Sequence, residues 1–159
     1  MVFPFCGTGM QKQNKHNKHK NQVRIIGGEL RGRKVRFADA EGLRPTADSV
    51  RERLFNWLGQ DLTGQTVLDL FAGSGALGFE AASRGAKRVV LVENNRRAAA
   101  SLQQQMQELR LPEKIEIQSI DAFEFLEKTN EQFDVVFLDP PFVWQGWAEL
   151  FMRLERCLH

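Results

Sequence analysis

Cysteine is scarce in this sequence of 159 residues, and long apolar runs are absent from it. The two cysteines, Cys6 and Cys157, lie far apart and form neither a disulfide framework nor the spacing of a metal site, which favours a reducing compartment. No apolar run approaches the ~20 residues that a membrane span requires. The first ten residues lack a basic segment and are too short for a secretory leader. We therefore expect a cytoplasmic protein with no bound metal and no membrane partner.

Basic residues are concentrated at the front of the chain, although the net charge is only +2. Residues 1–60 hold 12 Lys and Arg against 5 Asp and Glu, whereas the remaining residues hold 10 against 15. A basic front and an acidic back suggest that the front binds a polyanion. A solvated basic tail would give the same imbalance, so charge alone leaves both interpretations open.

Apolar strands alternate with helices from residue 66 onward. The strands are expected over 66–73, 88–93, 114–121 and 133–139. The helices are expected over 74–85, 96–111, 122–128 and 147–158. Continuous apolar strands between helices are typical of a parallel sheet that helices cover on both faces. The sequence therefore predicts an α/β core over residues 61–159.

The chain before this core divides into two parts. Residues 1–22 end in the polar stretch KQNKHNKHKNQ, which has no periodicity, and we expect a disordered basic tail there. Residues 23–60 begin with VRIIGGELRGRKVRF, which indicates two short strands around a Gly-Gly turn. A helix with one apolar face follows, and Thr46 or Asp48 can cap it.

A glycine loop joins the first strand of the core to its helix. Gly73, Gly75 and Gly78 form the pattern GxGxxG, which permits a tight turn and brings the backbone close to a ligand at a helix N-terminus. Glu93 ends the second strand, 20 residues after Gly73, where a carboxylate can accept hydrogen bonds from both ribose hydroxyls. These features predict a nucleotide-like cofactor but do not separate NAD from S-adenosylmethionine.

Three further acids favour S-adenosylmethionine. Asp69 lies inside the first strand, where a carboxylate can organise the loop and meet the cationic amino end of a methionine moiety. Asp121 ends the third strand, where it can meet an adenine amino group, and Asp139 ends the fourth. Because ligands of open parallel sheets bind outside the carboxyl ends of the strands, we expect these acids to face one crevice. A helix cap is the ordinary alternative for any one of them.

Six motifs in the same order resemble those of a known family. Class I S-adenosylmethionine-dependent methyltransferases that modify exocyclic amines have motifs similar to DLFAGSGALGFEA, LVENN, SIDAF and FLDPPF. The resemblance narrows to the bacterial RsmD family, which methylates N2 of a guanine in 16S ribosomal RNA, through RIIGGELRGRKVRF and GLRPTADSVRERLFNWL. It covers about residues 23–158 and implies a Rossmann-like class I methyltransferase fold with a small N-terminal β-hairpin. It also implies S-adenosylmethionine as cofactor and ribosomal RNA or 30S particles as partners of a monomer.

The resemblance assigns roles to individual positions. The cofactor would be bound by Asp69, Phe71, Ala72, Gly73, Ser74, Gly75, Glu93, Asn94, Asp121 and Ala122. The target base would be bound by the catalytic residues Asp139, Pro140, Pro141 and Phe142. RNA would be contacted by Arg24, Arg31, Arg33, Lys34, Arg36, Arg44, Arg51 and Arg53.

The residues after the fourth strand suit chemistry on an amine. A guanine amine is a poor nucleophile because the ring delocalises its lone pair, so hydrogen-bond acceptors that favour the pyramidal amine should help. Asp139 offers a carboxylate and Pro140 a main-chain carbonyl, whose direction the adjacent prolines fix. Phe142 offers a face on which a flipped base can stack. Two adjacent prolines also form plain turns, which is the alternative here.

The chain departs from the family at its carboxyl end. Family members continue with further strands of the sheet, whereas this chain ends at His159. The next strand of the family pairs beside the fourth, so we expect the C-terminal strands to be missing and that edge to be exposed. This departure leaves the activity of the chain open.

Three other functions remain open. Adenine N6 methylation of DNA or RNA uses the same acid-proline-proline-aromatic arrangement. An NAD(P)-dependent oxidoreductase would share the glycine loop, but the residues of hydride transfer are missing. A non-catalytic remnant would bind RNA and transfer nothing.

Overall fold

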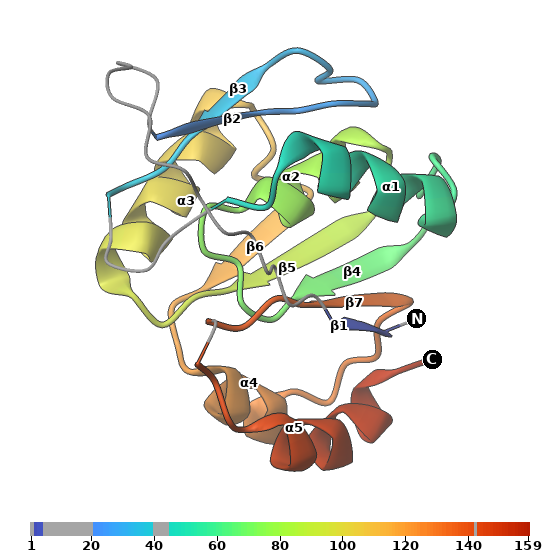
Figure 1. Cartoon of the computed structure of the whole chain (residues 1–159), viewed down its shortest axis with the longest axis vertical. Coiled ribbons are helices and arrows are strands. Elements are labelled where there is room, and N and C mark those ends of the chain that lie inside the picture. The colour runs from blue at the N-terminus through green and yellow to red at the C-terminus, as the bar shows by residue number, and fades with distance from the viewer. Residues whose placement is uncertain (1, 5–20, 40–44, 142) are drawn as a thin grey trace.

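A five-stranded parallel sheet forms the centre of the computed structural model, which describes residues 2–4, 21–39, 45–141 and 143–159 (Figure 1). The strand order is β1-β7-β4-β5-β6, and every neighbouring pair is parallel. The strands are β1 (Val2–Pro4), β4 (Thr66–Asp69), β5 (Arg88–Val92), β6 (Ile115–Gln118) and β7 (Val135–Leu138).

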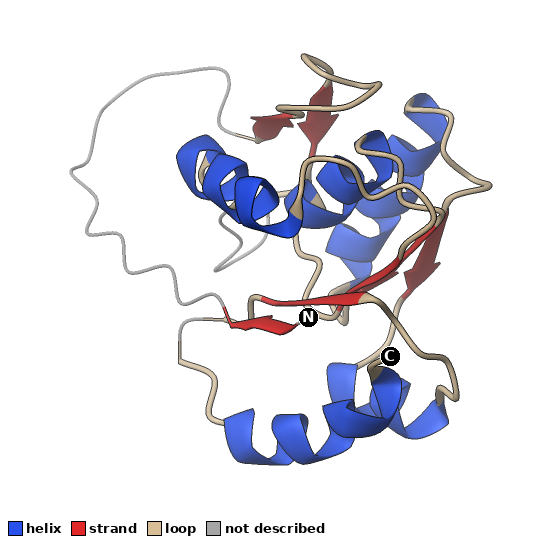
Figure 2. Ribbon diagram, turned by 90° about the vertical axis from the view of Figure 1, so that its right-hand side faces the viewer, coloured by secondary structure: helices blue, strands red, loops and turns tan. Residues whose placement is uncertain are grey.

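Helices cover both faces of the sheet, as the sequence predicts (Figures 1 and 2). One face carries α1 (Asp48–Leu58), α2 (Ala76–Ser83) and α3 (Arg96–Glu108). The other face carries α4 (Ala122–Lys128) and α5 (Trp147–Leu154), which continues as the short helix η1 (Glu155–Cys157). The predicted α/β fold is therefore confirmed.

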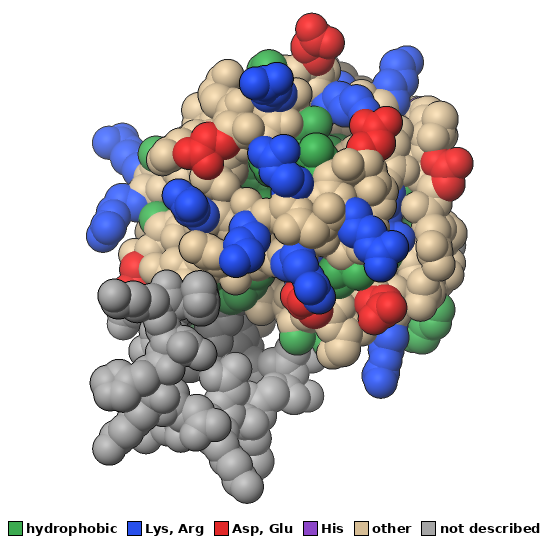
Figure 3. All heavy atoms as spheres, turned by 90° about the horizontal axis from the view of Figure 1, so that it is seen from above, with side chains coloured by type: hydrophobic (Ala, Val, Ile, Leu, Met, Phe, Trp, Pro, Cys, Tyr) green, Lys and Arg blue, Asp and Glu red, His purple; other side chains and the backbone are tan. Residues whose placement is uncertain are grey.

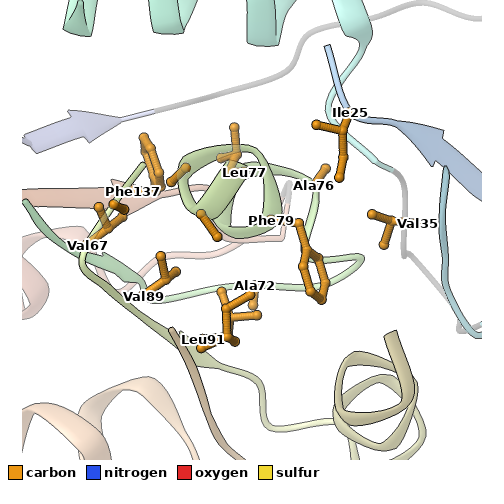
Figure 4. Packing of buried hydrophobic residues seen from close by; sticks show 14 of the residues in the cluster. Ile25, Val35, Val67, Ala72, Ala76, Leu77, Phe79, Val89, Leu91 and Phe137 are labelled. Atoms are coloured by element: carbon orange, nitrogen blue, oxygen red, sulfur yellow. The ribbon is translucent and has the colours of Figure 1, made fainter. Parts of the chain in front are cut away.

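Side-chain alternation along the strands builds two separate cores. Val67, Val89 and Leu91 point to the face of α1, α2 and α3, whereas Leu68 and Val90 point to the face of α4 and α5. Because both faces are buried, β7 is apolar throughout and β5 is apolar after Arg88, whereas the edge strand β6 alternates apolar and polar residues. Figure 4 shows the first core, in which side chains of the sheet meet those of α2 and of the N-terminal hairpin.

The N-terminal hairpin consists of β2 (Gln22–Arg24) and β3 (Lys34–Arg36), which pair antiparallel. The prediction of two strands is confirmed, and their connection runs over residues 25–33. Val23 and Val35 face each other in the register and are both buried, while their neighbours on β3 are exposed. The hairpin therefore packs one face on the first core and presents the other to solvent.

Side chains of α2 hold the hairpin in place. The two carboxylate oxygens of Glu80 accept hydrogen bonds from the backbone N–H groups of Gly27 and Ile26, at 2.8 and 2.9 Å. Ser83 Oγ accepts from the N–H of Leu30 at 2.9 Å and donates to the carbonyl of Gly27 at 2.6 Å. Gly28 has φ +77°, and a Cβ there would lie 1.9 Å from the Ser83 carbonyl oxygen, so only glycine fits this close approach. We call this set of contacts the hairpin clamp.

Two buried arginines complete the charge balance of the clamp. Arg51 Nη1 lies 3.2 Å from one oxygen of Glu80, and Arg84 Nε lies 2.9 Å from the other. Arg51 is 1% exposed and also donates to the carbonyls of Thr46 and Arg24. A buried carboxylate is costly unless it is paired and hydrogen-bonded, and Glu80 meets both conditions.

The prediction of a disordered tail over residues 1–22 is wrong at both ends of that range. Val2–Pro4 forms β1, and Gln22 begins β2, whereas residues 5–20 lie outside the described part of the chain. The prediction of an exposed edge beside β7 is wrong as well, because β1 pairs with Val136 to Leu138 of that strand. The unpaired N–H and C=O groups of an edge strand favour such pairing with an extended apolar segment.

Candidate active site

Four acids follow the carboxyl ends of four adjacent strands, as the sequence predicts. Asp69 ends β4, Glu93 follows β5, Asp121 lies beyond β6 and Asp139 follows β7. Because all strands of the sheet are parallel, these ends share one edge. The charges of Asp139 and Glu93 both raise the pKa of Asp69, so each of these two carboxylates lies within electrostatic reach of Asp69.

Asp69 is the most deeply buried of these acids. It is 1% exposed, and its Oδ1 has no hydrogen-bond partner within the described residues. Burial raises the pKa of this carboxyl from 3.8 to about 8, and the charges of Asp139 and Glu93 add to the rise. Backbone N–H groups of Phe71 and Gly78 partly offset it. A cationic group against Oδ1 would supply the missing contact and favour the charged carboxylate.

The glycine loop follows Asp69 in the chain and leads into α2. Gly73 and Gly75 have φ +54° and +80°, which side chains rarely adopt. A Cβ on Gly75 would also lie 2.6 Å from the ring of Phe79. The loop is held by Ala72, whose N–H donates to the Val92 carbonyl at 2.9 Å. Ser74, whose Oγ accepts from the N–H of Ala76 at 3.3 Å, is buried in the same turn.

Glu93 connects the glycine loop to the start of α3. Its Oε2 accepts from the N–H of Gly73 and its Oε1 from the N–H of Asn95, both at 2.8 Å. Asn95 in turn caps α3 by accepting from the N–H of Ala98 at 3.0 Å. A carboxylate has about four acceptor sites, so Glu93 keeps acceptor capacity for a ligand. Asn94, next to it, is exposed.

Asp121 caps α4 in this structure. Its Oδ1 accepts from the N–H groups of Phe123 and Glu124, at 2.9 and 3.4 Å. Asp121 is exposed and the adjacent Ala122 is buried. The cap was one of the two roles open to this acid from the sequence, and its contact with adenine stays a prediction.

Asp139 is held by a residue from the segment before α1. Thr46 Oγ1 donates to Asp139 Oδ2 at 3.0 Å. Burial raises the pKa of Asp139, and the Thr46 hydroxyl partly opposes the rise. The sequence suggested that Thr46 or Asp48 caps α1, and this is wrong, because Ala47 is the N-cap and no side chain caps the helix.

The two prolines after Asp139 lead to an aromatic cluster. Pro140 is half-buried, Pro141 is exposed, and the Pro141 carbonyl accepts from the N–H of Trp144 at 2.9 Å. The Trp144 ring lies edge-on to Phe71 at 5.2 Å and stacks on Phe123 at 5.7 Å. Phe142 lies outside the described residues. The cluster anchors the segment after β7 beside the glycine loop, and no sequence pattern indicated the part of Trp144 in it.

The basic residues predicted to contact RNA differ in their surroundings. The hairpin contributes exposed side chains at Arg24, Arg31, Arg33, Lys34 and Arg36, and α1 contributes exposed Arg53. Figure 3 shows that Lys and Arg prevail on the side of the molecule where the hairpin lies. The assignment of Arg51 to the RNA surface is wrong, because its guanidinium is buried in the core, where it forms an ion pair with Glu80. Arg44 lies outside the described residues.

In the part of the chain that the structure describes, no group of three or more His, Cys, Asp or Glu side chains could hold a metal ion. None of the helices in this part is long and apolar enough to cross a bilayer.

Known proteins have sequences similar to this chain. The family described as conserved hypothetical protein 95 matches residues 23–158. Ribosomal RNA small subunit methyltransferase D of Haemophilus influenzae is 48% identical over 126 residues, which are 77% of this chain and 65% of that protein. The protein of the same name from Escherichia coli K12 is 44% identical over 133 residues, which are 84% of this chain and 66% of that protein. The chain belongs to the RsmD family.

Solved structures agree with the fold of the RsmD family. The Escherichia coli protein yhhF has a TM-score of 0.77 and 39% identity, over 86% of this chain and 73% of that one. The 16S rRNA N2 methyltransferase RsmC of T. thermophilus, solved with AdoMet and guanosine, has a TM-score of 0.64 and 28% identity. That match covers 87% of this chain and 38% of RsmC. The Rossmann-like methyltransferase fold is thus confirmed, and the chain spans about two thirds, 65% and 66%, of the two curated RsmD-family relatives.

Proposed function

We propose that this protein transfers a methyl group from S-adenosylmethionine to the N2 amine of a guanine in small-subunit (16S) ribosomal RNA. The observation that carries the proposal is the buried carboxylate of Asp69, with its unpartnered Oδ1, beside Glu93 and Asp139 at the carboxyl edge of the sheet. Relatives named for ribosomal RNA methylation support it.

The residues around the glycine loop fit S-adenosylmethionine. Asp69 Oδ1 would accept from the ammonium of the methionine moiety, and the loop from Phe71 to Gly75 would lie along that moiety. Glu93 would accept from the ribose hydroxyls, with Asn94 beside the adenine. Asp121 and Ala122 would contact the adenine edge. S-adenosylmethionine supplies an electrophilic methyl group on its sulfonium.

The segment after β7 would orient the guanine. Asp139 and the Pro140 carbonyl would accept hydrogen bonds from the amine and favour its pyramidal form, while Pro141 fixes the segment and Phe142 stacks on the base. Because burial raises the pKa of Asp139, its carboxylate is a stronger base than an exposed one and suits the proton that the amine loses. Thr46 holds this carboxylate in one orientation.

The exposed face of the hairpin would bind the RNA backbone. Arg31, Arg33, Lys34 and Arg36 lie on a short segment fixed to α2 by the hairpin clamp. Cationic side chains of this kind neutralise phosphates and release counterions. RNA bound there would be held at a constant distance from the glycine loop.

A single assay tests the proposed function. The protein is supplied with radiolabelled S-adenosylmethionine and either 16S ribosomal RNA or 30S particles, and the labelled nucleoside is identified after digestion. We expect N2-methylguanosine. Labelled N6-methyladenosine would establish the adenine alternative, which shares the acid and prolines after β7. Binding of RNA without transfer of label would overturn the enzymatic proposal.

Guanine is favoured over adenine by one comparison. RsmC, the N2 methyltransferase with 28% identity to this chain, is solved with guanosine. An oxidoreductase is disfavoured because the acids at the strand ends include Asp69, for which a dinucleotide site has no need. Competitive titration with NADH and S-adenosylmethionine separates these two cofactors.

A further inference from the structure

A groove between the hairpin and α3 lies outside the residues assigned to the reaction. It has a volume of about 450 Å³. Its walls come from the end of β3, at Arg36 and Ala38, and from one face of α3, at Arg97, Ala100, Ser101 and Gln104. The spacing of these α3 residues places them on one helix face, and seven residues of helix span about 10 Å.

Hydrogen bonds between β3 and α3 fix the walls of this groove. Gln105, which is 2% exposed, accepts from the N–H of Arg36 at 2.8 Å through its Oε1. Ser101 Oγ donates to the Arg36 carbonyl at 3.4 Å. These contacts use the backbone of Arg36 and leave its exposed guanidinium for a ligand. The small side chains of Ala38 and Ala100 in these walls leave room for one.

The charge of the groove is positive and unpaired. Arg36 and Arg97 are both exposed, and neither forms an ion pair within the described residues. Arg97 also lies in the first turn of α3, which has no acidic residue, although cations there oppose the helix dipole. A residue that is unfavourable at its position in a helix is expected where a function requires it.

The groove leads from the hairpin towards the candidate active site. At one end Arg36 continues the exposed basic face of β3. At the other end Arg97 follows Asn95, whose N–H donates to Glu93 Oε1 at 2.8 Å. A chain bound along the groove would therefore reach the carboxyl edge of the sheet.

We propose that the sugar-phosphate backbone of the RNA substrate binds in this groove, with phosphates against Arg36 and Arg97. This assignment rests on the proposed function and adds Arg97 to the surface that contacts RNA. Guanidinium groups bind phosphate oxygens through paired hydrogen bonds, which suits a backbone without regard to its sequence.

Three variants test the groove against a labelled 16S ribosomal RNA transcript. The double variant R36Q/R97Q removes both cations. The variant A100F puts a bulky side chain into the groove without changing any charge. The control K87Q removes an exposed cation just before the amino end of β5, whereas the candidate active site lies at the carboxyl ends of the strands. Each is first checked for wild-type melting temperature and S-adenosylmethionine affinity.

We expect R36Q/R97Q to weaken RNA binding at least about tenfold. Its slope of log affinity against log salt should fall by about 0.7 to 0.9 for each lost phosphate contact, so by about 1.4 to 1.8 in all. A100F should weaken binding as well, with cofactor affinity unchanged. K87Q should leave both the affinity and the slope as they are.

Other outcomes separate this assignment from the proposed function. If the unaltered protein binds and methylates the transcript but R36Q/R97Q keeps its slope, or K87Q loses as much, the groove assignment is overturned alone. If the unaltered protein neither binds nor methylates RNA, the proposed function is overturned and the groove assignment with it.

Discussion

Protonation of Asp69 should be coupled to the binding of S-adenosylmethionine. In the free protein burial raises the pKa of this carboxyl to about 8, so most of the molecules hold a proton on Asp69 at pH 7. An ammonium group against Oδ1 would favour the charged carboxylate and lower that pKa. Binding of the cofactor should therefore release a proton from the protein.

The size of this release follows from the pKa. With a pKa of about 8, about 0.9 of the Asp69 carboxyls are protonated at pH 7 and about 0.5 at pH 8, so these are the protons released per bound cofactor. The dissociation constant should fall about tenfold between pH 6 and pH 7 and about fivefold between pH 7 and pH 8.

Calorimetry in buffers of different ionisation enthalpy measures the proton release directly. Asp69→Asn should abolish it and flatten the pH dependence, with the affinity reduced. Asp139→Asn offers a matched control: it removes one charge that raises the Asp69 pKa, so release should persist but centre at lower pH. Affinity that is independent of pH between 6 and 8, with no proton released, would refute the contact between Asp69 and the cofactor.

Protein stability should show the same titration with a definite sign. The Asp69 pKa is raised on folding, so the folded state binds more protons than the unfolded state between about pH 4 and pH 8. Stability should therefore fall as pH rises through this window, by at most about 1.4 kcal/mol per pH unit. Urea unfolding of Asp69→Asn without cofactor should lack this contribution.

Further substitutions separate the cofactor, the transfer step and the clamp. Glu93→Ala should weaken S-adenosylmethionine binding by about 1–3 kcal/mol by calorimetry, and unchanged affinity in a folded variant would contradict its role. Asp139→Ala should slow methyl transfer about 10²–10³-fold at wild-type melting temperature and with cofactor affinity no weaker than that of the wild type, and Thr46→Val should slow it about tenfold. Joint loss of stability and cofactor affinity in Asp139→Ala would instead indicate a purely structural turn. Glu80→Gln should lower the free energy of unfolding by about 3–5 kcal/mol in urea, because it leaves the buried Arg84 without a countercharge and Arg51 with Asp48 alone, and an unchanged midpoint would show that this network adds no stability.

The alternation of strands and helices could be predicted because burial on both faces makes the inner strands β5 and β7 nearly continuous apolar runs. The strand boundaries could not be predicted. The sequence predicts one strand over 114–121, whereas β6 covers Ile115–Gln118. Its length is set by pairing with Val89 to Val92 of β5, which is a property of the neighbouring strand.

Several site residues were misassigned because their partners lie far away in sequence. Thr46 has the sequence position of a helix cap, yet it bonds Asp139, 93 residues later. Arg51 lies in a charged stretch that is typical of an exposed helix face. Its ion pair with Glu80 of another helix nevertheless makes its burial possible. The acids at the strand ends were predictable, because the chain order and the parallel sheet suffice to bring them to one edge.

The hairpin clamp makes α2 a molecular ruler. The helix begins at Ala76, after its N-cap Gly75 in the glycine loop, and ends at Ser83, which holds the hairpin. Its eight residues span about 12 Å, and each inserted residue would turn the hairpin by about 100° around the helix axis. If the hairpin binds RNA as proposed, the distance from the hairpin to the glycine loop determines which guanine of the bound RNA reaches the active site. Changes of length should then be tolerated in surface loops such as 130–132 but not within α2.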